Sequence, residues 1–157
     1  MVSTKPVTIE ELLEIEAIKR VRILYSHYFD MFDIDNLIDL FTDDAVCEFG
    51  PNYGGDWVGK ERIRKGYQEF GGENGPFSGA MHANTNEWIE LTGPDTAKAR
   101  WYLLDLSVSG PADKNPLMLM GIYDDVYRKV DGAWKIERTY IDFVWPNRDY
   151  RGPRDAT

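Results

Sequence analysis

Apolar residues near the start of the chain recur at spacings of three and four, the period of one helical face. They are Ile18, Val21, Tyr25, Tyr28 or Phe29, and Phe32. Thr8 and Glu11 form the S/T-x-x-E pattern of a capping box, which marks where a helix begins. Because neither Gly nor Pro interrupts the segment, we predict one long helix over residues 8–32.

Shorter elements follow this helix. The pattern predicts a helix capped by Asp35 or Asn36, a short strand over 45–49, a loop over 50–59 and a third helix over 60–70. Leu37, Leu40 and Phe41 are expected on the inner side of the second helix. Four glycines and a proline make residues 71–79 the most flexible stretch expected.

The second half of the chain is strand-like. Strands are predicted over residues 80–91, 96–109, 117–130 and 133–145, each far longer than the usual five or six residues or so. Turn sequences join them in pairs: Gly93-Pro94-Asp95 and Asp131-Gly132. Long strands of this kind favour a strongly curved sheet.

Helices that precede an antiparallel meander indicate an α+β fold. We predict a cone-shaped, curved antiparallel sheet capped by three N-terminal helices, with a pocket between the two layers. Residues 1–157 are expected to form a single domain with its core over about 8–145. Residues 146–157, which contain three Arg and two Pro, are expected to form a loose tail or an oligomer contact.

Composition limits the possible partners. The formal net charge is −9, and 43% of the residues are hydrophobic. An acidic chain argues against nucleic acid and against docking on an anionic membrane, because both need clustered Lys and Arg. The first residues lack the profile of a secretion signal, and no apolar run could span a bilayer. We therefore expect a cytoplasmic protein.

Several chemistries lack their motifs. A single cysteine, Cys47, excludes an internal disulfide and a cysteine-cluster metal site. The chain has no phosphate-binding loop, no G-x-S-x-G and no H-E-x-x-H, and its two histidines are a poor metal signal. We expect no metal and no cofactor. Aromatic residues make up 13% of the chain, which either core packing or a cavity for an aromatic ligand would explain.

Three local patterns resemble the SnoaL-like group of the nuclear-transport-factor-2-like superfamily. They are IEAIKR at 15–20 with YFDMFD at 28–33 and LFTDDA at 40–45, Met81-His82, and RWYLLD at 100–105 with DGAWKI at 131–136. The resemblance covers residues 9–145 and implies a cone of curved sheet closed by helices. Within the group, the chain looks most similar to bile-acid dehydratases, dehydrochlorinases and scytalone dehydratase, which are cofactor-free lyases with an Asp–His dyad.

The resemblance implies four catalytic residues. His82 matches the dyad histidine, Asp33 the dyad aspartate, Tyr28 the dehydratase tyrosine five residues before it, and Asp105 a further pocket acid. An imidazole suits a base near neutral pH, and a carboxylate fixes its tautomer. Outside the resemblance, each residue also has a structural explanation. The relatives carry a basic residue on the last strand, but residues 140–145 here contain none.

The ordinary roles remain open beside the catalytic ones. Asp33, with its neighbours Asp30 and Asp35, could be a solvated charge or a helix cap, and Tyr28 could be a buried core aromatic. Alternation places Asp105 on the inner face of its strand with Trp101 and Leu103, where an acid needs an ion-pair partner or a proton. The candidate substrate-binding residues are Phe49, Tyr53, Trp57, Trp101, Leu103 and Phe143. His27 is expected at the helix surface without a role.

The leading hypothesis is a lyase that eliminates water from a hydrophobic aromatic or polycyclic small molecule, as in aromatic compound catabolism. Carbon–carbon cleavage would use the same groups. The alternatives are an isomerase similar to ketosteroid isomerases, and a non-catalytic ligand-binding or scaffold subunit like the small subunits of ring-hydroxylating dioxygenases. A homo-oligomer is expected, with a trimer favoured over a dimer.

Overall fold

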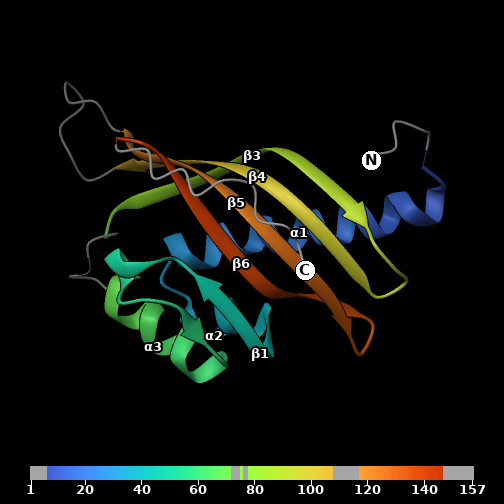
Figure 1. The fold of residues 1–157 in the computed structure, drawn as a ribbon, viewed down its shortest axis with the longest axis horizontal. Helices are drawn as coiled ribbons and strands as arrows, with labels where there is room; N and C mark the ends of the chain where they lie inside the picture. The colour runs from blue at the N-terminus through green and yellow to red at the C-terminus, as the bar shows by residue number, and fades with distance from the viewer. Residues whose placement is uncertain (1–6, 72–74, 76–77, 108–116, 147–157) are drawn as a thin grey trace.

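Three α-helices, a short 3₁₀ helix (Pro51–Tyr53) and a six-stranded sheet form the described part of the chain in a computed structural model, which describes residues 7–71, 75, 78–107 and 117–146 (Figure 1). The helices are α1 (Ile9–Asp30), α2 (Ile34–Asp39) and α3 (Lys60–Gly71). The strands are β1 (Phe41–Glu48), β2 (Trp57–Val58), β3 (Ala80–Leu91), β4 (Thr96–Ser107), β5 (Leu117–Val130) and β6 (Ala133–Trp145). Parts of the predicted flexible stretch (72–74 and 76–77) and of the predicted tail (147–157) lie outside the described residues.

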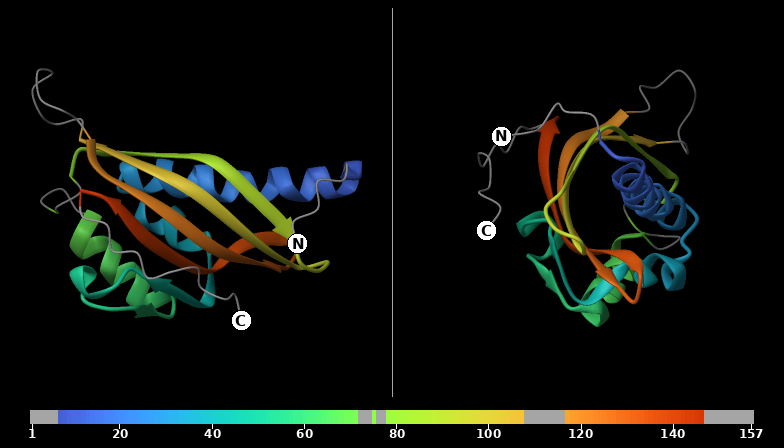
Figure 2. Two further views of the ribbon diagram at one scale, coloured as in Figure 1. Left: turned by 45° about the horizontal axis from the view of Figure 1, so that its top comes forward. Right: turned by 90° about the vertical axis from the view of Figure 1, so that its right-hand side faces the viewer.

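The sheet is curved and open, with the order β2-β1-β6-β5-β4-β3. The predicted antiparallel meander is confirmed for β3 to β6. The first strand corrects the prediction of a wholly antiparallel sheet, because β1 pairs with β6 in parallel. Figure 2 shows α1 on the concave side of the curved sheet. The fold is α+β, as expected.

The long helix begins as predicted and ends earlier. Thr8 and Glu11 close the capping box at its start. At its end, the N–H of Phe32 donates to Phe29 O and the N–H of Asp33 donates to Tyr28 O, which is a Schellman motif. Phe32 takes the left-handed conformation (φ 57°) that glycine usually occupies there. The chain therefore turns sharply after Asp30, and α2 begins with Asp33 as its cap rather than the predicted Asp35 or Asn36.

The turn between β5 and β6 follows the sequence signal. Asp131 (φ 51°) and Gly132 (φ 81°) both have positive φ, as a two-residue hairpin turn matched to sheet twist requires. The core lies between α1 and the concave face, where the inner positions of β4 and β5 are buried. No helix among the residues described is both long and apolar enough to cross a membrane.

Candidate active site

A cavity lies between α1, α3 and the concave face of the sheet. Its volume is about 40 Å³, enough for a few water molecules. Aromatic rings from α1, α3, β6 and the segment around β2 form most of its wall, and the side chains of His82 and Asp105 also line it. A ligand that contains an aromatic ring can therefore bind only if side chains of this wall shift.

His82 is held by Asp30, the last residue of α1. The imidazole Nδ1 lies 2.5 Å from Asp30 Oδ1, and the backbone N–H of His82 donates to Asp30 Oδ2 at 3.0 Å. A carboxylate can only accept hydrogen bonds, so the neutral imidazole must carry its proton on Nδ1. The lone pair of this neutral imidazole then lies on Nε2, the nitrogen that faces Asp105.

Asp105 lies on the other side of the same imidazole. The two residues are direct neighbours across β3 and β4, and His82 Nε2 is 3.6 Å from Asp105 Oδ2. Asp105 is buried, and this burial raises the pKa of its carboxyl, an effect that His82 opposes and the charge of Asp30 reinforces. The pair therefore places an imidazole beside a carboxyl group whose protonated form is favoured by burial.

Neighbouring contacts hold Asp30 and His82 in place. The Phe29 ring packs on the His82 imidazole with centroids 4.7 Å apart. One turn earlier on α1, Ser26 accepts a hydrogen bond from the side-chain amide of Asn84, two residues after His82 on β3. These contacts join α1 to β3 at two successive levels, which fixes the rotation of the helix against the strand.

Two of the predicted catalytic residues lie elsewhere. The side chain of Asp33 caps α2, where it accepts from the backbone N–H and the side-chain amide of Asn36. It does not pair with His82, because the chain has already turned away after Asp30. Tyr28 is half-buried at the edge of the core and outside the cavity lining. Tyr25, five residues before Asp30, lines the cavity instead.

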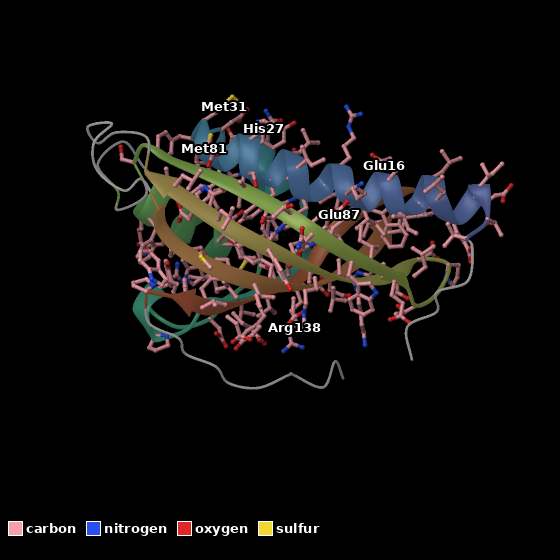
Figure 3. All side chains as sticks on the ribbon, turned by 90° about the horizontal axis from the view of Figure 1, so that it is seen from above. Glu16, His27, Met31, Met81, Glu87 and Arg138 are labelled. Carbon is pink, nitrogen blue, oxygen red and sulfur yellow. The ribbon has the colours of Figure 1, made fainter. Side chains whose placement is uncertain are left out.

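The expected wall is mostly present. Phe49, Tyr53, Trp57, Leu103 and Phe143 line the cavity. Trp101 is buried in the core on the same face of β4 but outside the lining. The prediction did not include seven further lining residues from α1, α3, β5 and β6, namely Tyr25, Phe29, Tyr67, Phe70, Leu119, Tyr123 and Ile141. His27 is exposed on the side of α1 turned away from the sheet, as expected (Figure 3).

The hydroxyl groups of Tyr25 and Tyr67, two residues of the cavity lining, lie next to each other. The Tyr67 hydroxyl donates to Tyr25 Oη at 3.0 Å. Burial raises the pKa of Tyr25 to about 12, although the nearby Arg22 charge opposes the rise. The Tyr25 hydroxyl therefore keeps its proton at neutral pH and can donate it in a hydrogen bond. Within the described ranges, no group of three or more His, Cys, Asp or Glu side chains is arranged to hold a metal ion.

Comparison with known families agrees with this fold. The SnoaL-like domain matches residues 10–140, which is most of the chain. The chain belongs to the SnoaL-like domain family. A search of curated proteins found no significant match.

Solved structures support the same assignment. A Novosphingobium aromaticivorans protein provisionally named a scytalone dehydratase is 28% identical to this SnoaL-like protein, with 91% of each chain covered and a TM-score of 0.71. A second protein from that organism, provisionally named an aromatic ring hydroxylase, is 27% identical, covers 90% of this chain and 94% of its own, and has a TM-score of 0.67. A Mycobacterium tuberculosis protein of unknown function shares the fold at 20% identity, with 90% and 78% coverage and a TM-score of 0.75.

Proposed function

We propose that this SnoaL-like protein is a cofactor-independent lyase that removes water from a hydrophobic aromatic or polycyclic small molecule. The observation that carries the proposal is the imidazole of His82, held between Asp30 and Asp105 at the wall of an aromatic cavity. The similarity to a protein provisionally named a scytalone dehydratase favours dehydration. The catalytic aspartate is thus Asp30 rather than Asp33.

The elimination would use three groups. His82 Nε2 takes the proton from a carbon next to a carbonyl, and the Asp30 carboxylate stabilises the imidazolium that forms. Tyr25 donates a hydrogen bond to the carbonyl oxygen as it gains negative charge. Asp105 gives its proton to the departing hydroxyl group, which leaves as water while the carbon–carbon double bond forms. Transfer of the proton from His82 Nε2 to Asp105 restores both groups.

The test is product analysis with matched histidine variants. The protein is incubated with aromatic and polycyclic β-hydroxy carbonyl compounds, and the products are followed by mass spectrometry for loss of one water. We expect His82→Gln to abolish turnover and His27→Gln, at the exposed histidine, to leave it unchanged. A fully active, folded His82→Gln variant would contradict the proposal.

The same experiment separates the competing reactions. A product of unchanged mass would indicate isomerisation, in which His82 returns the proton to another carbon. Loss of a small aldehyde would indicate carbon–carbon cleavage by the same groups. Binding without any product would favour a ligand-binding or scaffold subunit.

We also propose that the protein forms a homo-oligomer through the outer face of its sheet, with a trimer favoured over a dimer. Large apolar side chains are exposed on this face, namely Met81, Trp88, Tyr102, Leu104 and Trp145. Exposed apolar side chains that gather on one face are typical of protein interfaces. Sedimentation equilibrium should give a mass above that of the monomer, and replacement of Tyr102 and Leu104 by Lys should lower it. A monomer at micromolar concentration would contradict the proposal.

A further inference from the structure

A buried ion pair lies directly behind the cavity wall. Arg22 on α1 is 0% exposed and Asp125 on β5 is 2% exposed, with Arg22 Nε 3.6 Å from Asp125 Oδ2. Within the residues described, the three guanidinium nitrogens have no hydrogen-bond partner. A buried pair with this little hydrogen bonding is costly, and apolar residues in its place are often as stable or more so.

The guanidinium group contacts two tyrosines of the cavity wall. Its central carbon lies 3.5 Å from the centroid of the Tyr123 ring and 4.4 Å from that of Tyr25. Both tyrosines line the cavity, whereas Arg22 itself does not. The positive charge is therefore one ring away from the cavity. A cation on a phenol ring makes its hydroxyl a stronger hydrogen-bond donor.

The negative partner lies farther from the cavity. Asp125 follows Tyr123 by two residues on the same face of β5, and its Oδ2 accepts a hydrogen bond from the Tyr127 hydroxyl at 2.8 Å. Neither Asp125 nor Tyr127 is part of the lining. The positive end of the ion pair therefore lies toward Tyr25 and Tyr123 of the cavity lining. His82 and Asp105 belong to another part of the same lining.

We propose that Arg22 is a positioning residue that makes the cavity select ligands with an oxygen atom that carries or gains negative charge. Carbonyl compounds that form an enolate and phenols that ionise belong to this class. The oxygen would contact the hydroxyls of Tyr25 and Tyr123, and the Arg22 charge would stabilise it through their rings. The importance of this ligand selection for turnover rests on the proposed function. The selection itself can be measured by ligand binding alone.

The test uses 4-nitrophenol, whose neutral and ionised forms differ in visible absorption. The ratio of ionised to neutral bound probe is measured at one pH in the wild type and in Arg22→Met/Asp125→Asn, which removes both charges together. We expect the ratio to fall roughly tenfold in the double variant, which corresponds to about one pKa unit of the probe. Arg22→Lys retains the positive charge and is expected to keep the wild-type ratio.

The control is another Arg–Asp pair, which joins β4 to β5. Arg100 and Asp124 form a bidentate pair on the outer face of the sheet, so Arg100→Met/Asp124→Asn should leave the ratio unchanged. The ratio is read from bound probe without any turnover, so its failure is distinct from a failure of the proposed reaction. Any of three results would overturn the inference. The ratio is the same in the wild type and in Arg22→Met/Asp125→Asn, it is reduced in Arg22→Lys, or the wild type binds neither form of the probe.

Discussion

The pairing of Asp30 with His82 can be tested by replacing each of two aspartates that lie three residues apart, Asp30 and Asp33. In Asp30→Asn, one carboxylate oxygen becomes an NH₂ group. The backbone N–H of His82 also bonds to this carboxylate, and it can only donate, so the amide oxygen must face it. The NH₂ group then faces Nδ1 and forces the imidazole to carry its proton on Nε2.

The expected loss of activity follows from the geometry. Unit charges about 4 Å apart interact by about 4 kcal/mol at an effective dielectric constant near 20. Asp30 Oδ1 is only 2.5 Å from Nδ1, but 20% of the Asp30 side chain is exposed. We therefore expect the imidazolium to lose about 2–4 kcal/mol of stabilisation, which lowers kcat by about 30- to 1,000-fold.

The assay is ¹⁵N NMR of the histidine side chains, which distinguishes the two tautomers. The exposed His27 serves as an internal reference in the same spectrum. His82 should carry its proton on Nδ1 in the wild type and on Nε2 in Asp30→Asn. Asp33→Asn should keep the wild-type tautomer and the α2 cap, since Asn caps helices as well as Asp. An unchanged tautomer in Asp30→Asn, or a changed one in Asp33→Asn, would refute the reasoning.

Three further predictions concern stability. Gly71→Ala places a Cβ 2.4 Å from the Phe29 ring, so urea unfolding should show a loss of about 1–3 kcal/mol; a gain, as at an open helical site, would contradict this contact. Asp105→Asn should raise the melting temperature at neutral pH, because burial raises the pKa of Asp105 and charging it opposes folding. The gain in melting temperature should shrink as the pH falls toward the ordinary pKa of an aspartate carboxyl. A gain that grows on acidification would contradict the prediction. Thr8→Ala removes the helix cap and should lower stability by about 1 kcal/mol in thermal unfolding, whereas an unchanged melting temperature would mean that the cap contributes nothing.

The four long strands, β3 to β6, were predictable because local signals define them. Alternating apolar residues and the Asp131-Gly132 turn predicted β5 and β6 with the limits that the structure has. The parallel pairing of β1 with β6 was not predictable in this way, because no local turn connects the two strands. Their pairing depends on packing between distant parts of the chain.

The aspartate that contacts His82 lies three residues before the one that the sequence suggested. Apolar periodicity defines the buried face of α1, but positions three or four apart on that face have equivalent spacing. Both Asp30 and Asp33 follow an aromatic residue near the helix end. What separates them is the left-handed residue Phe32, and a phenylalanine gives no sequence signal for that conformation. A Gly at this position would have marked the end of the helix.

The parallel pairing of β1 with β6 also has a consequence for folding. The two strands are far apart in the sequence, and such pairs form slowly because a long loop must close before they gain any contact. β1 carries the segment with Phe49, Tyr53 and Trp57 to the cavity. During synthesis on a ribosome, β1 cannot pair with β6 until the last strand has been made, so the part of the cavity wall that follows β1 cannot be fixed earlier. A product truncated before β6 should therefore form no cavity and bind no ligand.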